Sequence, residues 1–217
     1  MSDSYLTIER EVRAEFKDKG SKFIAYLFPL TKEAELAERI SGLKSANIKA
    51  GHFCPAFRLR DGHFRSSDDG EPSGSAGKPI LNQLISAELV DVACVVVRYW
   101  GGTKLGVSGL ITAYKTATKL AIEESSIITK YETVNLILDF DYAIMGTLMN
   151  ALKQLKMNVV EKNLTAMPNI IIEVNKSELE LAITSIKAKM LGRSLEDITE
   201  ETEISGLKFS SSSSEKN

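Results

Sequence analysis

The sequence predicts an α+β fold that is divided into two domains. The first observation is the apolar stretch at residues 92–100, which is typical of a strand buried on both faces. The second is the helical spacing of apolar residues between segments of strand character. The third is a break at residues 125–133, after which the pattern restarts. We therefore expect one domain at residues 1–133, a second at 134–205 and a disordered, serine-rich tail at 206–217.

The elements of the first domain follow from the apolar pattern and from turn residues. Gly20 tolerates the positive φ of a turn between two strands. Thr31 is a suitable N-cap for a helix, and Pro79 suits the first turn of the next one. The expected elements are strands at 5–16 and 21–30, a helix at 32–46, a strand at 52–60, a helix at 79–89, a strand at 92–100 and a helix that contains 110–121.

The second domain is predicted to contain two strand–helix–strand units in succession. The expected elements are a strand at 134–141, a helix at 143–156, strands at 158–165 and 169–175, a helix at 177–190 and a strand at 195–204. The order βαββαβ within about seventy residues is the ferredoxin-like arrangement. Its sequence contains no catalytic constellation.

Composition is that of an ordinary globular protein. Of the 217 residues, 43% are hydrophobic and 26% are charged, which excludes collagen-like, wholly disordered and disulfide-scaffold proteins. The net charge is −2, so a nucleic-acid contact must use a local patch. Residues 1–133 carry 18 basic and 17 acidic residues, a net of +1, whereas residues 134–217 carry 9 and 12, a net of −3. Such a contact is therefore expected in the first domain.

The expected compartment is the reducing cytoplasm. The N-terminus is charged and lacks the apolar segment of a signal peptide. The longest apolar stretch is far shorter than the ~18 residues that suggest a membrane span, so we expect no membrane association. Two cysteines, Cys54 and Cys94, are too few for a disulfide framework.

A loop at residues 62–79 is rich in glycine, serine, proline and acidic residues, and loops of this length are often functional. Its carboxylates are candidates for holding a metal ion or a phosphate-bearing ligand. The alternative is a purely structural loop whose acids cap backbone amides. It is not a Walker A loop, because Pro79 stands where that motif has Ser or Thr. The candidate ligand-binding residues are Asp68, Asp69, Glu71, Ser73 and Lys78.

A predicted strand, a glycine-rich turn and a helix follow one another at residues 92–121. Glycines let a phosphate approach the backbone, and a helix N-terminus offers unpaired amides. Nearby cations would add charge, and an exposed aromatic ring would stack on a base. The alternative is that the glycines permit close packing and the aromatic rings fill the core. The spacing lacks the GxGxxG pattern, so we expect no dinucleotide cofactor. The candidate residues are Arg98, Tyr99, Trp100, Gly101, Gly102 and Lys104.

His52 and Cys54 share one face of a predicted strand. A structural zinc site usually needs four ligands, and the chain has only two histidines and two cysteines. We therefore expect neither a metal site nor a cofactor, and we take His52 as a residue that borders the candidate loops. Arg58, on the same predicted strand, belongs to a basic cluster at residues 44–65 and is a further binding candidate.

Taken together, these segments resemble the IMPACT/YigZ family over residues 5–205. The matching segments are 21–24, 52–56, 67–81, 95–106 and 109–110. The chain departs from the family pattern at Ser75, Trp100 and Ser108. Only Ser108 would restrict a backbone position where glycine is frequent, and none of the three departures removes a charged group.

The resemblance implies a fold and a field of activity. The first domain would have the βαβ type of fold found in a small-subunit ribosomal protein and in domain IV of elongation factor G. The second would resemble the ferredoxin-like domain V of that factor. Family members are linked to translational control, nucleic-acid binding has been proposed for two-domain members, and no enzymatic activity is established. Eukaryotic members use an additional N-terminal domain to compete for a protein partner. We do not expect that domain here, so the resemblance does not carry that partner over to this chain.

The sequence and the resemblance together predict a non-enzymatic regulator of translation that binds RNA or the ribosome through its first domain. In this hypothesis Arg98, Lys104 and Lys78 contact phosphates. One alternative is a small-molecule phosphate- or nucleotide-binding protein, or an enzyme, that holds a metal ion with its acidic loop. Another is a protein–protein adaptor in a stress or translation pathway that uses the same face.

Overall fold

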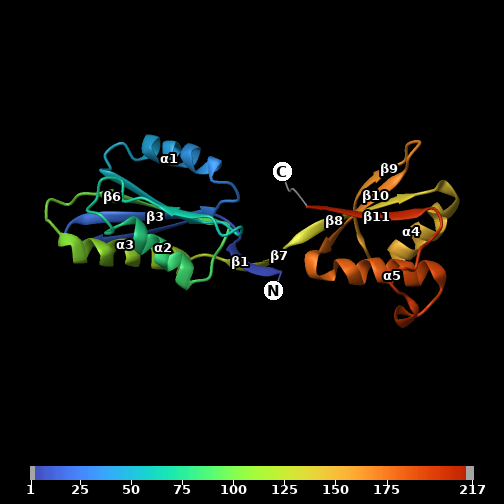
Figure 1. The fold of residues 1–217 in the computed structure, drawn as a ribbon. Helices are drawn as coiled ribbons and strands as arrows, with labels where there is room; N and C mark the ends of the chain where they lie inside the picture. Colours follow the sequence, from blue (N-terminus) through green and yellow to red (C-terminus); the bar gives the residue numbers. More distant parts are fainter. Residues whose placement is uncertain (1–2, 214–217) are drawn as a thin grey trace. The chain divides into compact units, whose positions relative to one another are not determined.

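The computed structural model describes residues 3–213, and these residues form two units (Figure 1). The first unit is Tyr5–Lys130, and the second contains the residues before Tyr5 together with those from Tyr131 onward. The second unit is therefore built from both ends of the chain. The backbone oxygen of Asp3 accepts a hydrogen bond from the Glu132 N–H over 2.8 Å, and its carboxylate accepts one from the Ser177 N–H.

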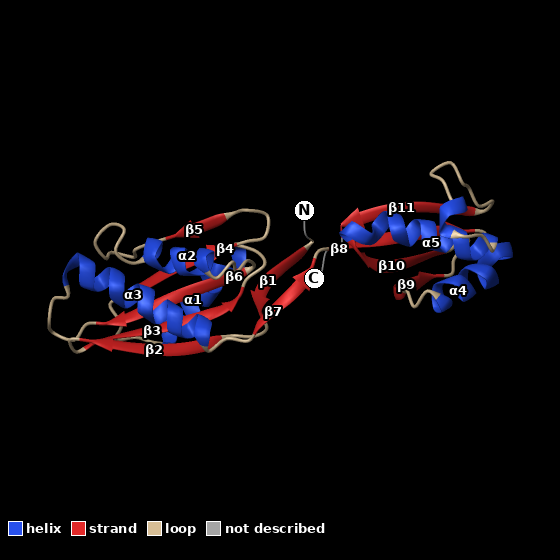
Figure 2. Cartoon of the chain, turned by 90° about the horizontal axis from the view of Figure 1, so that it is seen from below, coloured by secondary structure: helices blue, strands red, loops and turns tan. Residues whose placement is uncertain are grey.

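An antiparallel sheet of five strands, in the order β2-β3-β6-β4-β5, forms the centre of the first unit. Helix α1 (Ala34–Ala46) covers one face, and helices α2 (Gly77–Ser86) and α3 (Gly106–Glu123) cover the other (Figures 1 and 2). The expected βαβ unit consists of β3, α1 and β4, with β6 inserted between its two strands. The strands are β2 (Val12–Asp18), β3 (Ser21–Pro29), β4 (His52–Arg58), β5 (Phe64–Ser66) and β6 (Val92–Tyr99).

Strand β6 is buried on both faces, as its apolar sequence predicts. Because successive side chains point to opposite faces, Cys94 and Val96 pack against α2 and α3, while Val97 packs on the side of α1. Arg98 has the parity of Val96, so its charged side chain enters the α2 and α3 side. Tyr99 has the parity of Val97 and lies on the α1 side.

The second unit has a four-stranded antiparallel sheet in the order β11-β8-β10-β9, with a single apolar core between the sheet and two helices. This arrangement confirms the expected α+β fold class and the ferredoxin-like second domain. Its elements are β8 (Thr133–Phe140), α4 (Met145–Gln154), β9 (Asn158–Asn163), β10 (Asn169–Asn175), α5 (Leu179–Leu191) and β11 (Leu207–Ser213). The short 3-10 helices are η1 (Tyr142–Ile144), η2 (Lys176–Glu178) and η3 (Leu195–Asp197).

The last strand of this sheet is β11, so the strand expected at 195–204 is wrong. That segment begins with η3, where Ser194 and Asp197 form a capping box, and its several acidic residues disfavour a strand. The disorder expected from residue 206 is wrong for 207–213. There, Leu207 and Phe209 point into the core while the backbone pairs with β8. Residues 214–217 of the expected tail lie outside the described residues.

Three small strands also differ from the expectation. The strand expected at 5–16 is two strands, β1 (Ser4–Ile8) and β2, because the polar run after Ile8 interrupts the pairing. Strand β5 lies inside the expected loop, and β7 (Ile127–Tyr131) lies in the expected break. β1 and β7 form a separate two-stranded sheet. β5 and β7 expose most of their side chains, so neither shows the alternation that predicts a strand.

Candidate functional site

The acidic loop between β5 and α2 is organised by the carboxylate of Asp68. It accepts hydrogen bonds from the backbone N–H groups of Gly74, Ala76 and Gly77 at 2.8–2.9 Å. Burial alone would raise the pKa of Asp68, but these three amides favour the charged form and hold its pKa below the ordinary value of 3.8. Asp68 therefore anchors the loop and the start of α2.

We expect Asp68→Asn to lower the free energy of unfolding by about 1–2 kcal/mol at neutral pH, because one amide nitrogen would then face N–H donors. The folded-state pKa is depressed, so the stabilisation is present above the unfolded-state pKa and is lost as the pH falls through the folded-state pKa. Urea denaturation at neutral and acidic pH measures both effects. If the free energy of unfolding of Asp68→Asn fell with pH as steeply as that of the wild type, this role of Asp68 would be contradicted.

A buried ion pair lies beneath this loop. Arg98 Nη1 donates to Glu71 Oε1 over 2.6 Å, and the two side chains are only 8% and 3% exposed. The hydroxyl of Tyr114, from α3, donates to the same oxygen over 2.8 Å. The guanidinium also lies over the ring of Phe23, with 5.5 Å between the guanidinium carbon and the ring centroid. The ion pair thus ties the acidic loop to β6 and α3.

His52 and Cys54, at the start of β4, line the edge of this ion pair. His52 Nε2 lies 3.9 Å from Glu71 Oε1, and His52 Nδ1 is hydrogen-bonded to the backbone oxygen of Asp69 over 2.8 Å. The Cys54 thiol donates to the backbone oxygen of Asp68 over 3.1 Å. Burial raises the pKa of Cys54 to about 12, so at neutral pH it is a thiol and a poor nucleophile. Burial likewise raises the pKa of Tyr114.

Each carboxylate of the acidic loop has a protein donor of its own. Asp68 binds amides of its own loop, Asp69 accepts from the Phe53 N–H over 2.6 Å, and Glu71 binds Arg98 and Tyr114. Within residues 3–213, no three His, Cys, Asp or Glu side chains are grouped so that they could hold a metal ion. These contacts favour the alternative in which the acids cap amides and position the loop.

A second feature is the end of the sheet at which β6 stops. Gly101 packs directly against the backbone of Gly20, and a Cβ built on Gly101 would lie 1.8 Å from the Gly20 carbonyl carbon. The Gly101 N–H donates to the Ser21 hydroxyl over 3.1 Å, and the Tyr99 hydroxyl donates to Asn47 over 2.8 Å. Three loops therefore meet here, at residues 18–21, 47–51 and 100–104, and we call their exposed side the Trp100 surface.

The Trp100 surface combines exposed apolar side chains with lysines. Trp100 is 66% exposed and Ile48 is 86% exposed. Among the described residues, the lysines that form ion pairs are Lys17, Lys119 and Lys176, so no lysine on or beside this surface is paired with a carboxylate. These lysines are Lys19, Lys22, Lys49 and Lys104. Asp18 is the one acidic residue in the three loops. The local charge of the surface is therefore positive, although the chain carries a net charge of −2.

The structure divides the sequence-predicted residues into separate groups. Glu71 and Arg98 form the buried ion pair, and His52 and Asp69 lie beside it. Arg98 is therefore not the surface cation that a phosphate contact requires. Tyr99, Trp100, Gly101, Gly102 and Lys104 follow one another at the Trp100 surface, while Ser73 and Lys78 are exposed on the acidic loop and at the start of α2. Arg58 is the last residue of β4, at the opposite end of the sheet's strands, where it pairs with Val92 and donates to the Leu89 backbone oxygen over 3.4 Å.

Lys19, Lys22, Lys49 and Tyr114 have roles in these sites but were not candidates in the sequence. Lys19 and Lys49 lie in turns that the fold brings together, and no local pattern places two turns beside each other. Tyr114 had a usable signal: a tyrosine on the apolar face of a predicted helix needs a hydrogen-bond partner for its hydroxyl.

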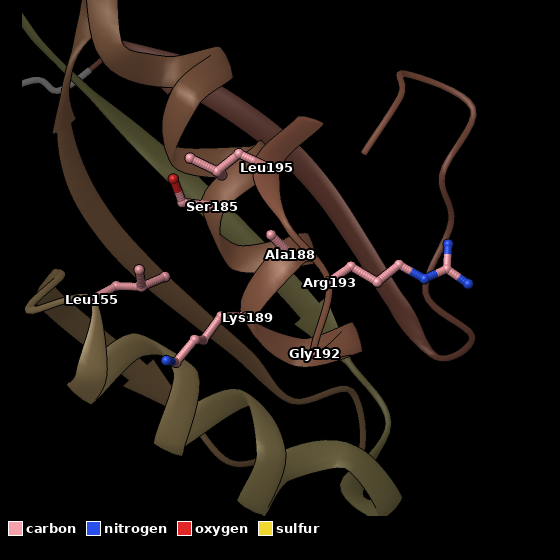
Figure 3. A pocket seen from close by; sticks show the side chains of 7 residues that line it. All are labelled: Leu155, Ser185, Ala188, Lys189, Gly192, Arg193 and Leu195. Atoms are coloured by element: carbon pink, nitrogen blue, oxygen red, sulfur yellow. The ribbon is translucent and has the colours of Figure 1, made fainter. Parts of the chain in front are cut away.

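The second unit has a surface hollow of about 410 Å³ between the end of α4 and the C-terminal half of α5 (Figure 3). Leu155 and Leu195 provide apolar lining, and Ser185 and Lys189 add polar atoms, whereas Arg193 points away from them.

In the described part of the chain, no helix is both long and apolar enough to cross a membrane.

Comparisons with known proteins cover both candidate features. A family model described as the Impact N-terminal domain matches residues 19–122, which include the acidic loop, the ion pair and Trp100. A Bacillus subtilis protein, described as IMPACT family member YvyE, is 33% identical over 156 residues, or 71% of this chain and 72% of that protein. A Haemophilus influenzae protein, described as an IMPACT family member, is 29% identical over 87% of this chain and 94% of its own.

One solved structure, described as the crystal structure of a hypothetical protein, has a TM-score of 0.68 to this chain. It is 23% identical and covers 96% of this chain, which in turn covers 97% of that one. The two proteins therefore share the fold of both units.

Proposed function

This chain belongs to the IMPACT family, and from that premise we propose that it is a cytoplasmic RNA-binding protein that regulates translation and contacts RNA on the Trp100 surface. One observation supports this most: Lys19, Lys22, Lys49 and Lys104 gather there without an ion pair to any described carboxylate. Lysines that are not neutralised by neighbouring acids are available to replace the counterions of a phosphate backbone.

The buried ion pair has a supporting role in this proposal. Arg98 and Glu71 are almost fully buried, so they do not reach a phosphate. They hold the end of β6 and the acidic loop in place, and the backbone oxygen of Arg98 accepts from the Gly51 N–H over 2.9 Å. The ion pair thereby fixes the strand end from which the 100–104 loop leaves and to which the 47–51 loop is bonded.

We expect the double variant Lys19→Ala/Lys104→Ala to bind ribosomal RNA more weakly and with less dependence on salt. Loss of two phosphate contacts should reduce the slope of log K against log [salt] by roughly 1.5. Filter binding over a salt series measures it, and co-sedimentation with ribosomes tests the same variant on the assembled particle.

Lys119→Ala is the matched control, because Lys119 is an exposed lysine far along α3 and pairs with Glu123. It should leave the slope unchanged, since an exposed pair of this kind contributes little. Equal slopes for the wild type and the double variant would refute the RNA contact at this surface.

A further inference from the structure

We infer that the Trp100 surface recognises single-stranded RNA, with the indole of Trp100 stacked on one unpaired base. This inference rests on the proposed function and specifies its ligand. It is carried by how the aromatic side chains and glycines at the end of β6 are placed, and not by the lysines.

Trp100 is the available aromatic ring, and its neighbour Tyr99 is not. The Tyr99 hydroxyl is bonded to Asn47, and the Lys22 ammonium lies 4.5 Å from the centre of its ring. Trp100 has 66% of its surface exposed. Of the two rings that the sequence offers for stacking, one is therefore engaged within the protein and one faces solvent.

The exposure of Trp100 does not come from a loose loop. Gly101 is held against Gly20, and its N–H is bonded to Ser21. Tyr99 on the other side is the last residue of β6 and pairs with Lys22 of β3. The backbone on both sides of Trp100 is thus fixed, so little backbone conformational entropy is lost when a base stacks on the ring.

The backbone beside Trp100 leaves room for a nucleotide chain. A Cβ built on Gly102 would meet nothing within 4 Å, so the main chain there is uncovered. Lys104 follows two residues later, and Lys19 is next to Gly20 in the facing loop. A base on the indole would therefore have its phosphates near lysines on either side.

Stacking on a protein ring requires a free base face. In a duplex both faces of each internal base are covered by neighbouring base pairs, whereas a single strand exposes them. Because every base has such a face, recognition by one indole tolerates many sequences. The ligand class is therefore single-stranded RNA without a strict sequence requirement.

Trp100 is the only tryptophan of the chain, so tryptophan fluorescence reports on this one ring. The probes are a single-stranded oligoribonucleotide that cannot form hairpins, a long RNA duplex in which ends are rare, and heparin as a polyanion without bases. We expect the single strand to quench the fluorescence, and the duplex and heparin to bind without comparable quenching.

Trp100→Ala should weaken binding of the single strand roughly fivefold to a hundredfold and leave heparin binding unchanged. Trp100→Phe should retain much of the affinity. Because the side chain is exposed, both variants should unfold at nearly the wild-type temperature. Lys104→Ala is the matched comparison and should weaken heparin and single-stranded RNA alike.

The outcomes separate this inference from the proposed function. If RNA binds through the lysines but Trp100→Ala binds the single strand as tightly as the wild type, base stacking is refuted and the RNA contact stands. Equal quenching by heparin also overturns the stacking. If neither RNA form binds at low salt, the proposed function itself fails.

Discussion

Replacing Glu71 with alanine is expected to lower the free energy of unfolding of the first unit by about 3–5 kcal/mol, because Arg98 is left charged in the interior. The expectation rests on burial: the two side chains are 8% and 3% exposed, and their atoms lie 2.6 Å apart. The buried Arg98 Nε has no hydrogen-bond partner among the described residues, so the guanidinium is already incompletely satisfied before Glu71 is removed. Urea denaturation of the full chain measures the loss.

The double variant Glu71→Ala/Arg98→Met provides the control for this prediction. It removes both charges and places an apolar chain over Phe23, so it should be more stable than the single variant. Tyr114→Phe removes the hydrogen bond to Glu71 and a weak contact with the Cys54 thiol, but no charge, so it should be milder than the loss of the carboxylate. If Glu71→Ala and the double variant unfold at the same urea concentration, the ion pair is not desolvated in solution.

The second large effect is expected for Gly101→Ala. The new Cβ would lie 1.8 Å from the Gly20 carbonyl carbon and 2.1 Å from both the Gly20 oxygen and the Ser21 nitrogen. These are backbone atoms of the β2–β3 turn, so the clash cannot be relieved by a change of rotamer. We expect a loss of about 3 kcal/mol or more in the free energy of unfolding.

Gly51→Ala is the matched control, since it lies at the same end of the sheet and its Cβ would meet nothing within 4 Å. It should unfold close to the wild-type urea concentration. A Gly101→Ala variant as stable as Gly51→Ala would show that the contact between the 18–21 and 100–104 loops is absent in solution.

The sequence predicts those elements that bury either both faces or one whole face, because their apolar residues then follow a regular pattern. Strand β6 and helix α3 are examples, because burial selects their residues. Strand β11 is the opposite case: its serines gain stability from backbone pairing with β8, and only Leu207 and Phe209 reveal a buried face. Backbone pairing leaves no mark on composition, so a serine run looks like a disordered tail.

The candidate site was located from its unusual loops, but the roles within it depend on three-dimensional context. Arg98 is a charged residue in an apolar strand. Its side chain lies on the same face of the strand as that of Val96, which is the interior face. Its partner, Glu71, is 27 residues away in sequence, and no spacing rule links them. The lysines of the Trp100 surface come together only through the close approach of Gly20 to Gly101 and the pairing of Gly51 with Arg98.

The discontinuous second unit has a consequence for the order in which the protein acquires structure during synthesis. The first unit is complete in sequence once Lys130 has been made, so it can fold while the rest of the chain is still being translated. Asp3 is synthesised before the first unit, yet its partner Ser177 is synthesised much later. The backbone of Asp3 can therefore pair with Glu132 soon after the first unit has been made, whereas the contact of its carboxylate with Ser177 has to wait for the final third of the chain.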